Sequence, residues 1–264
     1  MRDIREIPCD LTLPAVCNSE PAPGRRVIRQ LPVYRGTDVH HLLYLPEDWE
    51  PGRRYPVIVE YPGNGPVTVG PMGDFSSGLV EDCCLGYGIS AGRGFIWAVL
   101  PCVSTDGVRN QGHWWGDIAA TVDYCKQAVR EICADFGGDP DAVLLAGFSR
   151  GAIACNFIGL HDDEIAAFWR AFIAHSHYDG VKEWTAYPGS DRPSARARLQ
   201  RLGNRPVWIS HELSTAETRA YLAGIDAPFT FLDLPYPNHT AEWVLRDIPE
   251  RAALREWSSR VLKV

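Results

Sequence analysis

Residues 142–160 read AVLLAGFSRGAIACNFIGL, and this stretch decides the fold that the sequence predicts. Its first residues form a short, continuous apolar run, which is typical of a buried strand, and its last residues are the small and apolar residues of a helix. Between them the segment GFSRG at 147–151 has the pattern Gly-x-Ser-x-Gly. Placed between a strand and a helix, this pattern predicts a tight turn that holds the Ser149 hydroxyl out at the carboxyl end of a sheet. The alternative is an ordinary glycine-rich turn.

Strand-like and helix-like segments alternate along the rest of the chain. Apolar and β-branched runs predict strands at 38–46, 55–63, 94–102, 171–179, 206–212 and 228–235. Apolar residues at helical spacing predict helices at 117–136, 215–223 and 241–262, the last with a break near Pro249. This alternation favours an α/β fold with a mostly parallel central sheet flanked by helices. We expect one domain over residues 1–264, with residues 1–30 as an N-terminal extension.

The composition excludes several classes of protein. The 264 residues are 45% hydrophobic and 22% charged, with a net charge of −7, which disfavours disorder and coiled coils. The densest basic cluster, at 194–205, is interpreted as a solvated helix face, so no nucleic-acid partner is expected. No apolar run approaches the ~20 residues of a membrane span, and the N-terminus lacks the apolar core of a secretory signal. We expect a cytoplasmic protein if the sequence is complete, and a secreted or periplasmic one if a signal has been removed.

The eight cysteines show neither a Cys-x-x-Cys motif nor zinc-ligand spacing, so no metal is expected. Cys9 and Cys17 have a spacing that allows a disulfide in an oxidising compartment. Because no signal peptide is recognised, reduced thiols are favoured.

The sequence resembles the α/β-hydrolase superfamily from about residue 30 to the end. The resemblance is carried by LYLPEDWEPGRRYPVIVEYPGNG at 43–65, by the GFSRG turn and by PYPNHTAEW at 235–243. Among the subgroups it is most similar to polyhydroxybutyrate-depolymerase-like and feruloyl-esterase-like enzymes. The resemblance implies a serine ester hydrolase with a Ser-His-acid triad, a backbone oxyanion hole, and neither cofactor nor metal.

A serine nucleophile needs a base, and the chain order in this superfamily is Ser, acid, His. His239 lies in the loop after the last predicted strand and is the expected base for Ser149; its alternative is a surface loop histidine. The acid usually follows the preceding strand, which here reads PVWISHELSTAET and contains no Asp. Glu212 is the first choice for the acid, and Asp179 and Glu217 are the alternatives.

The resemblance also implies two backbone N–H donors for the oxyanion. One belongs to Arg150, directly after the nucleophile. The other is expected from the Pro-Gly-Asn-Gly loop at 62–65, with Asn64 as the donor and Gly65 as the next choice. The side chain of Arg150 allows two interpretations: contact with a uronic-acid ester, as in some esterases, or the commoner pairing with a nearby carboxylate.

The predicted mouth of the site carries adjacent tryptophans, Trp114 and Trp115. We expect at least one of them to stack on substrate; the alternative is that they pack beneath the loop. His177, at the end of a predicted strand, is a further substrate-contact candidate. The loops at 65–90 and 103–116 are rich in small and polar residues. The sequence therefore predicts a small, polar ester substrate, such as an acylated sugar or a hydroxycinnamoyl ester, and not a long-chain triglyceride.

Two other functions remain open. One is a peptidase of the same fold, which usually carries an accessory domain that gates the site. The other is a non-catalytic binding protein on a hydrolase scaffold, which typically lacks the nucleophile or the base.

Overall fold

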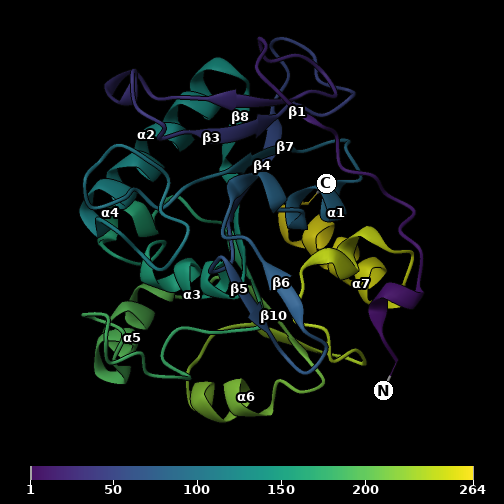
Figure 1. Ribbon diagram of the computed structural model, residues 1–264, viewed down its shortest axis with the longest axis vertical. Coiled ribbons are helices and arrows are strands. Elements are labelled where there is room, and N and C mark those ends of the chain that lie inside the picture. The colour runs from purple at the N-terminus through teal and green to yellow at the C-terminus, as the bar shows by residue number, and fades with distance from the viewer. Residues whose placement is uncertain (1, 264) are drawn as a thin grey trace.

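The computed structural model describes residues 2–263 and is built on one large sheet (Figure 1). Its nine strands are β1 (Val16–Cys17), β2 (Arg26–Arg29), β3 (His41–Tyr44), β4 (Tyr55–Tyr61), β7 (Ile96–Val99), β8 (Gly138–Phe148), β9 (Ala171–His175), β10 (Val207–Glu212) and β11 (Phe229–Leu234). They lie in the order β1-β2-β3-β7-β4-β8-β9-β10-β11. From β7 to β11 all neighbours are parallel, whereas β3 is antiparallel to both β2 and β7. A separate antiparallel pair is formed by β5 (Val67–Val69) and β6 (Asp74–Ser76).

Helices cover both faces of the sheet. One face carries α1 (Leu85–Ser90) and α7 (Pro249–Leu262), which contact each other. The other carries α2 (Ile118–Asp135), α3 (Arg150–Phe157), α4 (Asp163–Ala166), α5 (Arg192–Leu199) and α6 (Ala216–Leu222). Figure 1 shows α2, α3 and α4 on one side of the strands and α1 and α7 on the other.

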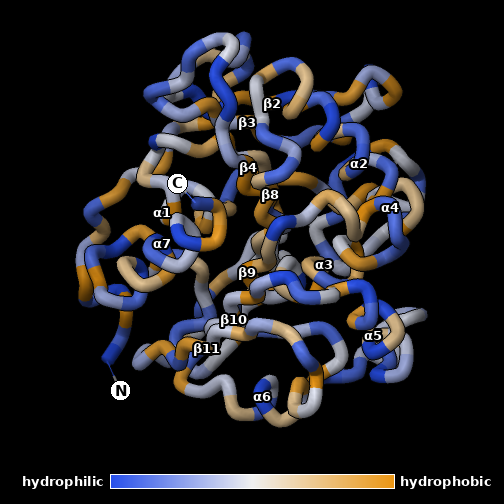
Figure 2. Tube along the Cα trace, turned by 180° about the vertical axis from the view of Figure 1, so that it is seen from behind, coloured by the Kyte–Doolittle hydropathy of each residue, from blue (hydrophilic) through white to orange (hydrophobic). Residues whose placement is uncertain are grey.

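Buried strands explain the continuous apolar runs in the sequence. All seven residues of β4 are buried, as are the last seven residues of β8. Strands covered on both faces need apolar residues at every position, because neither side of the pleat meets water. Figure 2 shows β8 as an apolar stretch through the middle of the molecule. The sheet therefore separates two apolar clusters, one under each layer of helices.

The predicted alternation of strands and helices is confirmed, including the break before Pro249, where the 3-10 helix η5 (Glu242–Leu245) ends and α7 begins. Residues 2–30 are not separate from the sheet, since they supply β1 and β2, and Ile4 is buried in the core. Helix α1 was not predicted, because its sequence LGYGIS resembles a glycine-rich loop. Its glycines serve packing: a Cβ on Gly86 would lie 2.1 Å from the Trp97 ring.

One basic residue of the 194–205 cluster departs from the expected solvated face. Arg198 on α5 is buried and forms an ion pair of 2.9 Å with Asp179. All eight cysteines are free thiols, and Cys9 is exposed.

Candidate active site

The turn from β8 into α3 has the geometry that the sequence predicts. Ser149 lies at φ 54° and ψ −117°, a strained conformation for a residue with a side chain. A Cβ on Gly147 would lie 2.0 Å from the carbonyl oxygen of Gly151, and one on Gly151 would lie 2.0 Å from that of Tyr61. Both glycines are therefore required by close backbone approach. The turn leaves Ser149 with 7% of its surface exposed.

His239 reaches this serine from the loop that follows β11. Its Nε2 lies 3.0 Å from Ser149 Oγ. Its backbone N–H donates to Asp74 Oδ2 at 2.9 Å, so the start of β6 fixes the loop. The ring of Phe148 lies against the imidazole, with 4.8 Å between ring centres. A serine hydroxyl at this distance from an imidazole is the arrangement in which the imidazole can take the hydroxyl proton.

Ser176 joins His239 to Glu212. Its hydroxyl donates to Glu212 Oε1 at 2.8 Å and lies 2.8 Å from His239 Nδ1. The direct separation between His239 Nδ1 and Glu212 Oε1 is 3.0 Å. Ser176 is fully buried and lies at φ 80°, so its backbone is held in the left-handed region. The imidazole is thus in contact with both the carboxylate and the hydroxyl that binds it.

The environment of Glu212 keeps it ionised. Burial alone would raise the pKa of this carboxyl, but the hydrogen bond with His239 and the nearby imidazoles of His175 and His211 outweigh burial and hold the pKa well below its usual range. His211 lies 3.2 Å from the second carboxylate oxygen. A buried, ionised carboxylate beside an imidazole is what orienting a base requires.

The two alternative acids do not reach His239. Asp179 binds the guanidinium of Arg198 through two hydrogen bonds of 2.9 and 3.1 Å. Glu217 is an exposed residue in the first turn of α6. Within residues 2–263, His239 forms no hydrogen bond or ion pair with either one. Of the three candidate acids, the structure brings only Glu212 to the imidazole.

The loop at 62–65 lies against the serine turn. A Cβ on Gly63 would approach the Phe148 ring to 3.0 Å, and one on Gly151 would lie 3.0 Å from the carbonyl oxygen of Pro62. Gly65 N–H donates to the carbonyl oxygen of Gly112 at 2.9 Å, so it is not available to a ligand. The backbone N–H groups of Asn64 and Arg150 have no acceptor within residues 2–263. These two N–H groups remain the oxyanion-hole candidates.

The side chain of Arg150 has a structural role that the sequence did not indicate. It is 1% exposed, and its guanidinium donates to the backbone carbonyl oxygens of Gln111 and Trp114. No carboxylate within residues 2–263 pairs with it, so the expected ion pair is wrong. Burial lowers the pKa of this guanidinium. Arg150 therefore ties the 111–114 loop to the first turn of α3.

The likeness to known proteins lies in structure and not in sequence. No family model matches, and no match is found among curated protein sequences. An S-formylglutathione hydrolase from Agrobacterium tumefaciens superposes with a TM-score of 0.59 at 14% identity, over 92% of this chain and 98% of that one. A thermostable esterase superposes with a TM-score of 0.54 at 15% identity, over 89% of this chain and 62% of that one. Oligopeptidase B from Leishmania major superposes with a TM-score of 0.53 at 11% identity. The match covers 90% of this chain and 36% of the oligopeptidase.

The chain has the α/β-hydrolase fold. The resemblance first drawn from GFSRG and its context is thereby confirmed at the level of the fold. In this fold the serine turn, the carboxylate and the histidine come from the ends of β8 and β10 and from the loop after β11.

The tryptophans of the 103–115 loop are buried, at 7% for Trp114 and 3% for Trp115. Trp115 stacks on Phe157, with ring centres 4.4 Å apart and an interplanar angle of 4°. Trp114 packs on Trp184 and Tyr187, with ring centres 4.6 and 4.4 Å away. Both side chains therefore pack beneath the loop, and the expectation that they form the stacking wall is corrected: Trp184 supplies the accessible indole, backed by Trp114.

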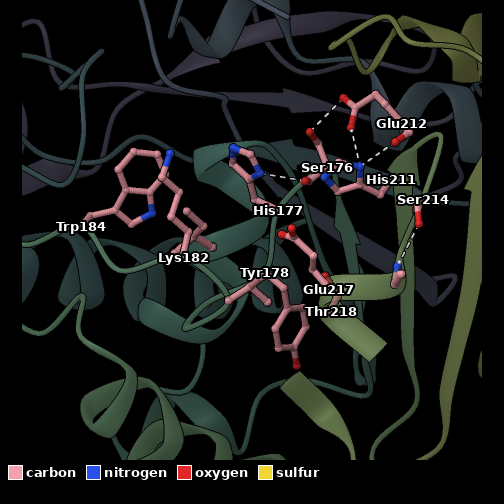
Figure 3. Close-up of a pocket in the computed structure, with 13 residues that line it drawn as sticks. Ser176, His177, Tyr178, Lys182, Trp184, His211, Glu212, Ser214, Glu217 and Thr218 are labelled. Carbon is pink, nitrogen blue, oxygen red and sulfur yellow. Dashed lines mark hydrogen bonds and ion pairs between the residues drawn. The ribbon is translucent and has the colours of Figure 1, made fainter. Parts of the chain in front are cut away.

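Two cavities are lined by residues that contact His239 or are chain neighbours of Ser149 and His239. The larger has a volume of about 510 Å³ and is lined by six residues from the 176–184 segment, six from the 211–218 segment, and Ile153 of α3 (Figure 3). His177 lines it, as do Ser176 and Glu212. The second, of about 360 Å³, is lined by Gly63, Phe148 and Thr240 on its inner side and by Phe75 and Leu79 further out.

Sequence reasoning missed Ser176 and Trp184. Ser176 follows directly after β9, which lies between β8 and β10, so the strand order places it between the serine and the carboxylate. Trp184 lies in an irregular stretch that carries no periodic signal. Within residues 2–263, no helix is long and apolar enough to cross a membrane, and no cluster of three metal-ligating side chains is present.

Proposed function

We propose that this α/β-hydrolase is a serine ester hydrolase. The observation that carries the proposal is the continuous series of contacts from Ser149 Oγ to His239 Nε2 at 3.0 Å and from His239 Nδ1 to Glu212 Oε1 at 3.0 Å. Series of this kind activate a hydroxyl that is otherwise a weak nucleophile.

The proposed mechanism has two halves. In the first, Ser149 Oγ attacks the ester carbonyl while His239 Nε2 takes its proton, and the resulting oxyanion accepts hydrogen bonds from the backbone N–H groups of Asn64 and Arg150. Glu212 stabilises the imidazolium. His239 then gives the proton to the leaving alcohol, and the C–O bond to that alcohol breaks. In the second half, His239 takes a proton from water, which attacks the acyl-enzyme. The C–O bond to Ser149 then breaks, His239 returns the proton to Ser149 Oγ, and the acid leaves.

We further propose a small, polar ester as the substrate, such as an acylated sugar or a hydroxycinnamoyl ester, in preference to a long-chain lipid. Supporting this, the larger cavity is lined by several polar side chains, among them His177, Lys182 and Glu217. A lipid chain would leave the partly buried His177 ring nitrogen without a hydrogen-bond partner, which costs free energy.

A peptidase of the same fold is the alternative, since this chain also superposes on an oligopeptidase, of which it spans 36%. A non-catalytic binding protein is disfavoured because a buried carboxylate and a strained serine turn are both retained. Neither feature contributes to the binding of a ligand at a distance from the serine.

The test of the function is turnover of a small aryl acetate by the purified protein and by Ser149→Ala. We expect the alanine variant to lose activity by several orders of magnitude, as in other serine triads. Its fold should persist, because Ser149 lies at the end of the strand and replacing its hydroxyl opens no cavity in the apolar clusters. Near-normal turnover by a correctly folded Ser149→Ala protein would refute the proposal.

A further inference from the structure

The larger cavity lies beside His239 and is lined by two residues that contact its imidazole. Ser176 and Glu212, which contact His239, form its inner wall, and Ile153 lies one turn along α3 from Ser149. The His177 ring centre lies 5.5 Å from that of His239 and 6.3 Å from that of Trp184. A ligand group that enters this cavity beside His239 would therefore meet His177 and then Trp184.

His177 presents a fixed hydrogen-bond acceptor to this cavity. Its Nδ1 lies 2.7 Å from the carbonyl oxygen of Ser176, and since a carbonyl oxygen only accepts, Nδ1 carries the hydrogen. Burial, assisted by the nearby His239, lowers the pKa of His177 to about 4, so the ring is neutral near pH 7. Nε2 then bears a lone pair, and it has no partner within residues 2–263. Figure 3 shows this nitrogen turned away from Ser176, on the side of Lys182 and Trp184.

The outer part of the cavity offers an aromatic surface between groups of opposite charge. Trp184 is half-buried and is supported from behind by Trp114. The ammonium group of Lys182 lies 4.3 Å from the Trp184 ring centre and has no carboxylate partner within residues 2–263. Glu217 lies on the opposite wall, on α6. A ligand thus meets donors from Lys182 and acceptors from His177 and Glu217.

These features select one class of ligand. A carboxylate or phosphate would direct its own lone pairs at His177 Nε2 and would meet Glu217, while a hydrocarbon would leave the partly buried His177 Nε2 unsatisfied. Hydroxyl groups both donate and accept, so they satisfy all three side chains. The apolar face of a ring that carries such hydroxyls matches the surface of an indole.

We propose that this cavity is a binding subsite for a hydroxyl-rich, sugar-like ring of the ester substrate, with His177 Nε2 accepting a hydroxyl and the Trp184 side chain packing against the ring. The inference rests on the proposed esterase function and adds the part of the substrate that the enzyme recognises. The ring belongs either to the leaving alcohol, as in an acetylated sugar, or to the acyl group, as in a sugar-acid ester.

The experiment compares matched esters. In the first pair glucose 6-acetate is set against ethyl acetate, and in the second methyl glucuronate is set against methyl butyrate. For Trp184→Ala and His177→Leu we expect the ratio of kcat/KM within at least one pair to fall by about tenfold or more. His177→Gln should lose less, because its amide oxygen reaches the region of Nε2. The control is Phe75→Ala, which removes a 66% exposed aromatic side chain from the other cavity and should leave both ratios unchanged.

Direct binding separates this inference from the esterase proposal. We expect Ser149→Ala protein to bind at least one of methyl glucoside, methyl galactoside and methyl xyloside in calorimetry, and Trp184→Ala in the same background to weaken that binding by about tenfold. Absence of all ester hydrolysis, with binding retained, would refute the esterase function and leave the subsite standing. Unchanged ratios in both ester pairs for both Trp184→Ala and His177→Leu, or no binding of any glycoside, would overturn the subsite.

Discussion

Replacing Ser176 with alanine removes one hydroxyl from between the imidazole and its carboxylate. That hydroxyl lies 2.8 Å from both Glu212 Oε1 and His239 Nδ1. The alanine variant leaves the backbone, the Glu212 carboxylate and the His239 imidazole in place. It therefore tests whether the hydroxyl helps to position the base or only fills space.

The expected loss of kcat in Ser176→Ala depends on the contacts that His239 keeps in the variant. A hydrogen bond to a charged group contributes about 1.5–3 kcal/mol. Because His239 Nδ1 already lies 3.0 Å from Glu212 Oε1, a small rotation restores a direct bond and recovers part of this loss. We expect kcat to fall by about 10-fold to 100-fold, which corresponds to ~1.4–2.7 kcal/mol of barrier. KM should change little, because the Ser176 hydroxyl is already occupied by its two partners.

A matched glycine variant separates positioning from stability. At φ 80° a residue with a Cβ is strained by about 1–2 kcal/mol, whereas glycine is not. Ser176→Gly should therefore unfold at a higher denaturant concentration than Ser176→Ala, while both variants show the same reduced kcat. Steady-state kinetics on a small ester and urea unfolding measure the two quantities. A kcat that follows the stability of the variants, or that equals the wild-type value in both, would refute the positioning role.

Two further predictions concern charge. Glu212→Gln should lower kcat by about 10²–10⁴, as expected for loss of the orienting carboxylate. Asp179→Asn should lower kcat far less and should mainly destabilise the fold, because it breaks the buried ion pair with Arg198. Equal losses of kcat in the two variants would contradict the assignment of Glu212 as the acid. Burial lowers the pKa values of His175 and His177 from 6.5 to about 4. As the pH falls from about 7 to 4, these two histidines therefore take up protons in the unfolded chain before they do so in the folded protein. The free energy of unfolding should fall over that range by up to about 1.4 kcal/mol per pH unit for each histidine. In urea unfolding, the free energy of His177→Gln should depend less steeply on pH than that of the wild-type protein. Equal pH dependence in the two proteins would contradict this prediction.

The strands and the serine turn were predictable because their signals are local. The buried strands of a parallel sheet leave continuous apolar runs, and the glycines at 147 and 151 are required by the backbone that surrounds them. His239 and Glu212 were predictable from chain order, since each follows a recognisable strand. The acid could not be chosen from sequence with certainty, because the ion pair that occupies Asp179 depends on Arg198, 19 residues away.

The groups that sequence reasoning misplaced depend on tertiary packing. Trp114 and Trp115 lie in a loop at the expected edge of the sheet, but the sequence does not show that Phe157 and Tyr187 cover them. Trp184 lines the larger cavity because residues 181–190 fold back over Trp114. The position of Ser176 between Ser149 and Glu212 can be predicted only when the strand order β8-β9-β10 is known.

The most direct measurement is covalent labelling with a fluorophosphonate, followed by mass mapping of the modified peptide. An activated serine reacts with this reagent, whereas an ordinary serine does not. We predict one adduct per chain on Ser149, a strongly reduced labelling rate in Glu212→Gln, and none in Ser149→Ala. Labelling of a different serine, or no labelling of the folded wild-type protein, would contradict the assignment of Ser149 as the nucleophile.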